Sequence, residues 1–400
     1  MKKKLLIHNG SISIGGQEKM LIEFLKVLNP EKYEVLLLIE QNIGKDKNYV
    51  DEIPEWIRYF FLTSKNLIEK LENNRRSKNP FKRMYYSFLL SEKKRKAAKE
   101  LKRYLDFSDI IIDFNMGLLR NIHKLELKDK TLVGWSHAGN GELPKSSCKR
   151  KNTERYDYIV AINERMKKGY EKSTKRPQIV KLYNFMGLES IIEKSKIAIP
   201  EKFKYIVSVG SLTDNKNQGL LIDVFYELKK ESDIEEKLIL IGEGKERARL
   251  EEKVKNLGME KEIFLLGAKL NPYNYIKDAE LYVVTSKEEG FSLTTLEAMT
   301  LKTMVIATKT DGTREILGED SQYGKLVESS KEELKREILY YLKNREKRRV
   351  YEELGYTRAK DFSKENAITK IEEFIDRLWE YMWLVIEIKS LKNWIMEEMR

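Results

Sequence analysis

The sequence predicts two doubly wound α/β domains followed by a helical extension. Its 400 residues exceed the usual size of one hydrophobic core, so two domains are expected. Short apolar segments alternate with helical segments in two successive series, which is typical of parallel sheets covered on both faces by helices. Residues 366–400 then carry an apolar stripe at helical spacing.

The first series occupies residues 1–186. It opens with an apolar strand at 4–8, and a helix begins near 15–18 with apolar residues at helical spacing. Four further buried strands are expected, at 33–39, 109–113, 131–135 and 158–162. Residues 187–202 lack a strong periodic pattern, and we expect them to be a linker.

The second series occupies residues 203–365. Strands are expected at 205–210, 237–241, 263–266, 281–285 and 304–308, with helices at 217–230, 245–257 and 294–300. Ligands of such a domain bind beyond the carboxyl ends of its strands, and two such domains usually enclose a cleft. The stripe that follows is expected to pack back across the domains, with membrane or subunit contact as the alternative; it comprises Ile371, Phe374, Ile375, Leu378, Met382 and Ile386.

The composition is that of an ordinary globular protein. Hydrophobic residues make up 41% and charged residues 35%, which excludes disordered and fibrous classes. A single cysteine, Cys148, excludes an internal disulfide framework and suits a reducing compartment. The apolar stretch at 5–7 is too short for a signal peptide. We therefore expect a cytoplasmic location, extending to the inner face of the cell membrane.

Nearly all of the net positive charge falls in one segment, 65–103. It holds fourteen Lys and Arg against four Glu, a net of +10 out of +12 for the chain. The charges are interleaved with Phe81, Met84, Tyr85, Tyr86, Phe88 and Leu89. This pattern predicts peripheral contact with an anionic membrane or a lipid-linked phosphate acceptor. A solvated helix face is the alternative.

The segment 286–299 carries the most informative chemistry. Glu289 and Glu297 are separated by seven residues, directly after the strand at 281–285. Between them, Gly290 allows close approach of the backbone to a ligand, and the amides of 291–294 point from a helix N-terminus, where anions bind. The pattern predicts carboxylates for sugar hydroxyls beside amides for a diphosphate.

This segment resembles the E-x7-E signature of retaining glycosyltransferases of family 4, which have the GT-B fold of two Rossmann-like domains facing a cleft. The resemblance extends over roughly residues 4–378, through the Gly-Gly-Gln-Glu loop at 15–18 and the segments 209–212, 216–217, 240–244, 266–267 and 289–299. It implies retaining transfer of a hexose or N-acetylhexosamine from a nucleotide sugar, a UDP-sugar, to a glycan or lipid-linked acceptor. Bacterial surface polysaccharide synthesis is the implied setting.

The resemblance also implies individual roles. Glu289 would bind hydroxyls of the donor sugar, Glu297 the ribose, and Lys216 the diphosphate. His137 follows the strand at 131–135 and is similar to a family histidine near the donor sugar, with a structural histidine as the alternative. Glu289, His137 and Lys216 are thus the candidate catalytic residues. His8 lacks such a context and is expected to be structural, as is His123.

The resemblance implies that the first domain, 1–186, is the acceptor side and that the second, 203–365, binds the nucleotide sugar. Donor-binding residues are nevertheless assigned to both domains. The amides of Leu293 and Thr294 would hold the distal phosphate, and Gly15 and Gly16 would approach it from the first domain. The family often has an arginine where this chain has Ser211, so Lys216 or a cation from elsewhere must compensate. The candidate donor-binding residues are Gly15, Gly16, Ser211, Lys216, Gly290, Phe291, Ser292, Leu293, Thr294 and Glu297.

No Asp-x-Asp triplet occurs in the chain, so we expect no metal and no cofactor. The leaving-group charge would then be offset by Lys216 and helix amides. The alternatives are a nucleotide-sugar epimerase of similar fold, a phosphorylase, for which no pyridoxal lysine motif is seen, and a basic nucleic-acid-binding protein that uses 65–103. The last leaves Glu289 and Glu297 unexplained, so no nucleic-acid partner is expected.

Overall fold

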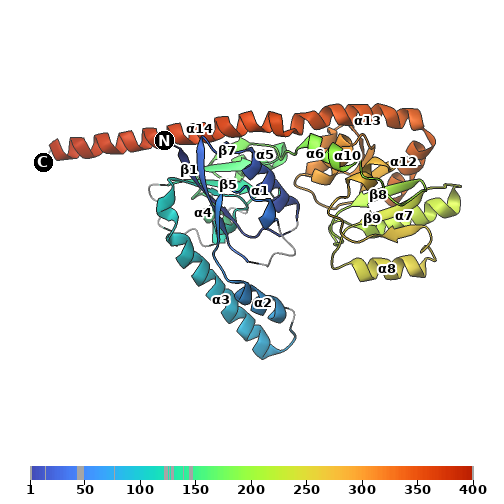
Figure 1. Ribbon diagram of the computed structural model, residues 1–400, viewed down its shortest axis with the longest axis horizontal. Helices are drawn as coiled ribbons and strands as arrows, with labels where there is room; N and C mark the ends of the chain where they lie inside the picture. The colour runs from blue at the N-terminus through green and yellow to red at the C-terminus, as the bar shows by residue number, and fades with distance from the viewer. Residues whose placement is uncertain are drawn as a thin grey trace. The chain divides into compact units, whose positions relative to one another are not determined.

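A computed structural model of the chain divides it into two compact units (Figure 1). Unit 1 comprises Met1–Tyr183 and Ala367–Arg400, and unit 2 comprises Asn184–Asn366. The described residues are 2–13, 15–42, 49–75, 77–120, 125, 127, 130–137, 139–143 and 147–398, without the side chains of Arg120 and 383–398. His123 and the side chain of Ile386 therefore lie outside the described part.

Unit 1 is built on a parallel sheet with the strand order β3-β2-β1-β4-β5-β6-β7. Its strands are β1 (Lys3–Asn9), β2 (Tyr33–Ile39), β3 (Arg58–Phe61), β4 (Ile110–Asp113), β5 (Thr131–Ser136), β6 (Tyr158–Ala161) and β7 (Gln178–Lys181). The central pair, β1 and β4, places His8 opposite Asp113 and is buried throughout its apolar length. The edge strands β3 and β7 were not predicted; each has only four residues, and in neither strand is any residue fully buried.

The helices of unit 1 outside its extension are α1 (Gly16–Val27), α2 (Lys65–Asn74), α3 (Pro80–Lys102), α4 (Cys148–Thr153) and α5 (Glu164–Ser173). The apolar face of α1 packs on the sheet, where the Phe24 ring lies 5.4 Å from Phe114 and 5.0 Å from Trp135. Burial of this face explains why the helical spacing after residue 15 is apolar on one side only.

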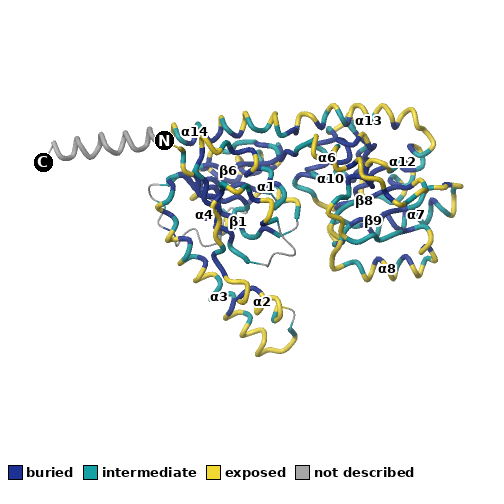
Figure 2. The backbone as a smooth tube through the Cα atoms, viewed as in Figure 1, coloured by how far each residue is buried: buried dark blue, intermediate teal, exposed yellow. Residues whose placement is uncertain are grey.

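Helices α2 and α3 form a hairpin that extends from the sheet of unit 1 and is largely exposed at its far end (Figures 1 and 2). Pro80 opens α3 and the Asn79 side chain caps it, accepting a 2.9 Å hydrogen bond from the Phe81 amide. The hairpin has a small core of its own, made of Leu67, Ile68, Leu71 and Leu89. Its tip therefore keeps its shape without covering the main sheet.

Unit 2 is built on a second parallel sheet, with the order β10-β9-β8-β11-β12-β13. Its strands are β8 (Tyr205–Val209), β9 (Lys237–Ile241), β10 (Ile263–Leu265), β11 (Leu281–Val284), β12 (Val305–Thr308) and β13 (Lys325–Val327). Its helices are α6 (Leu188–Lys194), α7 (Gln218–Glu231), α8 (Arg247–Asn256), α9 (Tyr273–Lys277), α10 (Leu293–Thr300), α11 (Asp311–Leu317), α12 (Lys331–Lys343) and α13 (Arg345–Ala359).

The expected linker at 187–202 is corrected by the structure. It contains the helix α6, which contacts α9 and α10 and belongs to unit 2. The helix has only seven residues and buries a single apolar side chain, Ile191, too few for a periodic pattern in the sequence. The chain instead passes between the units at Tyr183 and Asn184.

The extension is a single helix, α14 (Lys364–Glu398), whose residues from Ala367 onward belong to unit 1. Its stripe is buried at Ile371, Phe374, Ile375, Leu378 and Met382. Ion pairs of 2.5 Å from Lys3 to Asp376 and 2.6 Å from Lys32 to Glu372 flank the stripe. In the described part of the chain, no helix combines the length and apolarity needed to span a bilayer.

Candidate functional site

The candidate site in unit 2 lies where the strand order reverses. Strands β8 and β11 are neighbours, but β9 and β12 continue the sheet on opposite sides of them. The loops that follow β8 and β11 therefore diverge at the carboxyl edge of the sheet, which is where ligands of doubly wound folds bind. Lys216 lies in the first loop and Glu289 in the second.

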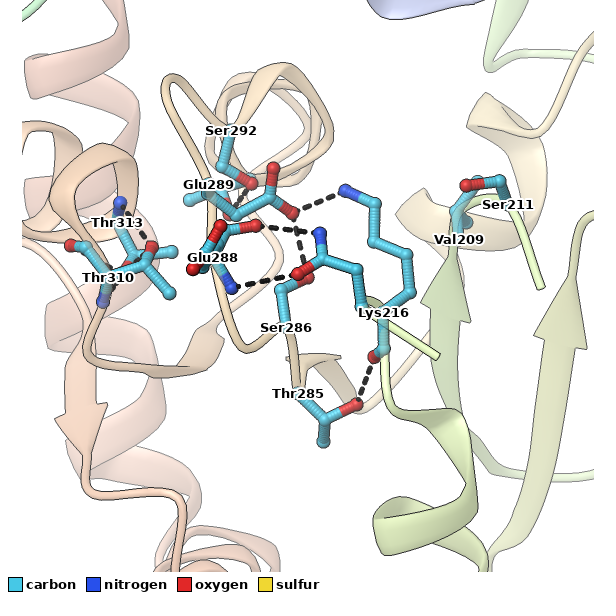
Figure 3. Close-up of polar contacts among 12 residues, drawn as sticks. Val209, Ser211, Lys216, Thr285, Ser286, Glu288, Glu289, Ser292, Thr310 and Thr313 are labelled. Carbon is cyan, nitrogen blue, oxygen red and sulfur yellow. Dashed lines mark hydrogen bonds and ion pairs between the residues drawn. The ribbon is translucent and has the colours of Figure 1, made fainter. Parts of the chain in front are cut away.

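An ion pair joins these two loops directly (Figure 3). The Lys216 ammonium contacts Glu289 Oε1, and the Ser286 hydroxyl donates a 2.7 Å hydrogen bond to the same oxygen. The side chain of Glu289 is only 10% exposed and that of Lys216 is 26% exposed. A carboxylate so far removed from water needs a cation and a donor beside it, and Lys216 and Ser286 supply them.

Hydrogen bonds to the backbone hold the two loops in place around the ion pair. The Asn215 amide group donates to the Glu288 carbonyl at 2.9 Å and its oxygen accepts from the Glu288 N–H at 3.1 Å. The Thr285 hydroxyl donates to the Lys216 carbonyl at 2.9 Å, and the Gly312 amide of α11 donates to the Glu289 carbonyl at 2.8 Å. The carboxylate therefore sits on a backbone that is held from both sides.

A small cavity opens beside the ion pair. It is lined by Ser208, Val209, Lys216, Gln218, Val284, Thr285, Ser286, Glu289 and Thr294. Tyr282 lies beneath it, fully buried, and donates to the Val209 carbonyl at 3.1 Å. Burial raises the pKa of this phenol, so Tyr282 stays a neutral hydrogen-bond donor. The structure thus brings Lys216, Glu289 and Thr294 to one place.

Helix α10 starts at this cavity. Its N-cap residue, Ser292, makes no side-chain capping bond, and its hydroxyl accepts from the Thr295 hydroxyl at 2.9 Å. The amides of Leu293 and Thr294 therefore begin a helix without a side-chain cap, an arrangement that favours a bound anion. Glu297 lies one turn further on, is buried, and has the Tyr273 hydroxyl 3.4 Å from its carboxylate.

The loop after β8 has little room at its start. An added methyl group on Gly242 would stand 1.9 Å from the Gly210 carbonyl oxygen, so only glycine lets these two loops approach. Ser211 follows, with an exposed side chain and a carbonyl that accepts from Gln218 at 3.1 Å. Lys216 is the cation that the loop places against Glu289.

The remaining predicted residues lie in unit 1. Gly15 and Gly16 start α1, where the Glu18 carboxylate accepts hydrogen bonds from Ser11 at 3.0 Å and Ser13 at 3.4 Å. His137 follows β5, with its ring 4.8 Å from that of Phe114 and both ring nitrogens buried. Burial lowers the pKa of His137 to about 3, so the imidazole is neutral at physiological pH.

His8 has the structural environment expected of it. It lies at the end of β1 with its Nδ1 atom 3.0 Å from Asp113 Oδ1, and both side chains are buried. The sequence analysis gave no role to Asp113, nor to Asn215, Ser286 and Tyr282 of unit 2. For Asp113, Ser286 and Tyr282 the signal is a polar side chain in or just after a buried strand, whereas Asn215 lies in the loop between β8 and α7. Within the described residues, no three His, Cys, Asp or Glu side chains converge as metal ligands.

Comparisons with known proteins agree with this geometry. Residues 190–358, which lie within unit 2, match the family model for glycosyl transferases group 1. Over 375 residues the chain is 29% identical to a Campylobacter jejuni protein, covering 90% of this chain and 96% of the relative. That relative is N-acetylgalactosamine-N,N'-diacetylbacillosaminyl-diphospho-undecaprenol 4-alpha-N-acetylgalactosaminyltransferase.

Solved structures are similar over nearly the whole chain. Anabaena Alr3699/HepE in complex with UDP-glucose has a TM-score of 0.71 at 18% identity, covering 94% of this chain and 99% of that one. Sucrose-phosphate synthase from Thermosynechococcus elongatus has a TM-score of 0.75 at 15% identity, covering 95% and 100%. The fold is therefore of the GT-B class, with two Rossmann-like units and a helical C-terminus, and the prediction of this fold is confirmed.

The ion pair of unit 2 can be tested by its effect on stability. Replacing Lys216 by Met leaves the Glu289 carboxylate poorly hydrated, so we expect the free energy of unfolding to fall by about 2 kcal/mol. Glu289→Gln should cost less, because Lys216 can turn toward water. The double variant should be more stable than the sum of both changes predicts, by about 1 kcal/mol. Urea unfolding of the four proteins measures this coupling, and additive effects would contradict it.

Burial of His137 predicts a pH dependence of stability. Its folded-state pKa of about 3 lies below the ordinary value of 6.5, so the unfolded chain binds a proton that the folded chain rejects between these values. This group should therefore reduce the free energy of unfolding by about 2 kcal/mol from pH 7 to pH 5. His137→Phe should lose less stability over that range. Parallel stability curves for the two proteins would show that His137 is hydrated instead.

Proposed function

We propose that this chain is a retaining, metal-independent glycosyltransferase that moves a hexose or N-acetylhexosamine from a UDP-sugar to a lipid-linked glycan acceptor. The observation that carries the proposal is the Lys216–Glu289 pair beside the uncapped start of α10. A carboxylate, an ammonium and helix amides at one strand edge match the hydroxyls and diphosphate of a nucleotide sugar. Nothing in the similarities to known proteins supports the epimerase or nucleic-acid-binding alternatives.

The ion pair suggests how the donor is bound. A diphosphate that enters beside α10 competes with Glu289 for the Lys216 ammonium, and the released carboxylate can then accept hydrogen bonds from sugar hydroxyls. The same ammonium and the amides of Leu293 and Thr294 offset charge as the diphosphate leaves. For retention we propose front-face attack, in which the departing phosphate oxygen takes the proton of the acceptor. No metal is needed, because fixed protein charges perform its role.

The acceptor class is supported by the Campylobacter relative, whose substrate is a glycan on diphospho-undecaprenol. This chain is similar to that relative over 96% of the relative's length. We propose the same acceptor chemistry, a glycan linked through phosphate to a lipid, in the synthesis of a bacterial surface glycan at the cytoplasmic face of the membrane.

The α2–α3 hairpin supports contact with an anionic membrane. Phe81, Met84, Tyr85 and Phe88 follow one another at helical spacing on α3, and each is exposed. The same face continues with the exposed Arg95, Lys99 and Lys102. An apolar tip followed by a basic stem fits shallow insertion below lipid headgroups, and each cation near them contributes about 1 kcal/mol.

The donor site is tested by an activity assay. Wild-type protein should release UDP from UDP-N-acetylgalactosamine, UDP-N-acetylglucosamine or UDP-glucose in the presence of glycosylated undecaprenyl diphosphate and excess EDTA. Glu289→Gln keeps the side-chain shape and the Ser286 contact but loses the charge, so we expect transfer to fall by about 100-fold or more while the fold survives. Full activity of a folded Glu289→Gln protein would remove Glu289 from the site. Activity that needs added Mg²⁺ would refute metal independence.

Membrane contact is tested by cosedimentation with vesicles. The wild-type protein should pellet with phosphatidylglycerol vesicles at low salt and be released at high salt. Exposed fractions of 75%, 67% and 63% at Phe81, Met84 and Phe88 mean that replacing all three by Ser should leave the fold intact and weaken binding at least tenfold.

The matched control replaces two exposed apolar residues of α13, Val350 and Leu354, by Ser. This variant should bind vesicles like the wild type. A wild-type protein that stays in the supernatant, or a hairpin variant that binds normally, would contradict the membrane role. Equal pelleting with neutral phosphatidylcholine vesicles would contradict the electrostatic part.

A further inference from the structure

Unit 1 has its own point of strand-order reversal, between β1 and β4. β2 and β5 continue the sheet on opposite sides of this pair, so the loops after β1 and β4 diverge at its carboxyl edge. In unit 2 the equivalent edge carries the Lys216–Glu289 pair. The carboxyl edge of the unit 1 sheet is therefore a second place where a ligand can bind.

The loop after β4 is fixed by Asp113. This buried carboxylate accepts from Tyr156 at 2.6 Å and lies 3.0 Å from the His8 ring nitrogen. It also accepts from the backbone amides of Gly117 at 3.0 Å and Leu118 at 2.9 Å. Four partners around one carboxylate leave the loop 113–118 little freedom.

This rigid loop presents the side chain of Asn115 between two glycines. An added methyl group on Gly10 would stand 2.7 Å from Asn115 Nδ2, and one on Gly117 would stand 2.7 Å from Asn115 Oδ1. The next residue, Met116, has a left-handed φ of 51°, a conformation that costs about 1 kcal/mol for a non-glycine residue. Two glycines that leave room for the Asn115 amide and a strained backbone at Met116 thus determine where this amide lies.

The two ends of this amide differ. Asn115 Oδ1 accepts a 3.0 Å hydrogen bond from the Gly117 amide, which fixes the orientation of the group. Nδ2 has no hydrogen-bond partner among the described residues, and the side chain is half-buried. The orientation therefore directs an unused N–H donor away from the turn that holds it.

Unsatisfied polar groups also lie on the neighbouring strand ends. Asn9, at the end of β1, has a buried Oδ1 without a donor, although its Nδ2 bonds Ser11 at 2.5 Å. His137, just after β5, buries both of its ring nitrogens. The paired strands β1 and β4 thus lead into two neutral polar atoms, Asn9 Oδ1 and Asn115 Nδ2, that no described residue satisfies. A buried atom of this kind, as Asn9 Oδ1 is, is uncommon in folded proteins unless a water, an ion or a ligand completes it.

We infer that Asn115 determines acceptor recognition, its Nδ2 donating to a hydroxyl oxygen of the acceptor sugar. The inference rests on the proposed function. The charged edge of unit 2 suits a diphosphate, whereas a neutral amide beside neutral acceptors suits a sugar, each of whose hydroxyls accepts and donates. Asn115 is a specificity residue in this account and takes no part in bond breaking.

The decisive variant is Asn115→Asp. Aspartate keeps Oδ1, and hence the bond from the Gly117 amide, but replaces the N–H donor by a second acceptor. The matched control is Asn29→Asp, because Asn29 is also half-buried in unit 1 and its Oδ1 also accepts from the amide two residues on, that of Glu31 at 2.8 Å. It precedes β2, at the opposite edge of the sheet. The two variants change charge identically.

Two measurements use a soluble probe, p-nitrophenyl α-N-acetylgalactosaminide, as acceptor with UDP-N-acetylgalactosamine as donor. In kinetics, Asn115→Asp should raise the KM for the acceptor about tenfold or more, while the KM for the donor stays at the wild-type value. In saturation-transfer NMR without donor, the probe should receive signal from the wild type and from Asn29→Asp but much less from Asn115→Asp. Gly10→Ala, which displaces the amide, should resemble Asn115→Asp.

The outcomes separate this inference from the proposed function. An unchanged acceptor KM in Asn115→Asp, or equal changes in the KM for donor and acceptor, would overturn it, as would a wild type that gives the probe no signal. A wild type that binds the probe through Asn115 but releases no UDP would overturn the proposed function and leave a sugar-binding edge. Loss of the saturation-transfer signal in Asn29→Asp as well would mean that the added negative charge, and not the lost Asn115 donor, weakens probe binding, and would also overturn the inference.

Discussion

Glu289 is a nearly buried carboxylate, and losing its hydration costs free energy. The residues around it offset that cost. Lys216 must come from the neighbouring loop to neutralise it, which in turn requires β8 and β11 to lie side by side. Asn215 and Gly312 then hold the backbone on each side. In the proposed function, the donor's phosphate takes the place of the carboxylate on Lys216, because the ammonium already has an anion.

The two sheets share one geometric feature, a point where the strand order reverses, but they place different chemical groups there. Each ends in a pair of diverging loops where its strand order reverses. In unit 2 the loops carry opposite charges and an uncapped helix start. In unit 1 the charge of Asp113 is buried beneath the loop after β4, and that loop presents the neutral amide of Asn115. The division fits a reaction in which one substrate is an anion and the other attacks through a hydroxyl.

Much of this could be predicted from the sequence, because continuous apolar strands such as 33–39 and 131–135 leave an unmistakable pattern when both faces of a sheet are covered. Glu289 and Glu297 were predicted as site residues because their spacing resembles that of a known family, and the structure places Glu289 against Lys216. The edge strand β3 and the short helix α6 were not predicted, because neither buries enough apolar residues to produce a periodic hydrophobic pattern in the sequence. Asn115 could not be found at all. Its role depends on Gly10, a hundred residues away, which becomes its neighbour only when β1 pairs with β4.

The return of α14 to unit 1 has a consequence for how the polypeptide is made. Unit 2 is continuous in sequence and can complete its fold once Asn366 has left the ribosome. Unit 1 begins first but is completed after unit 2, because Phe374, Leu378 and the other buried residues of α14 are synthesised only after unit 2. Throughout translation of the second half, the nascent first half therefore carries an uncovered apolar surface. A stop codon that removed only α14 would spare every residue of the donor site and still produce a chain prone to chaperone capture and degradation.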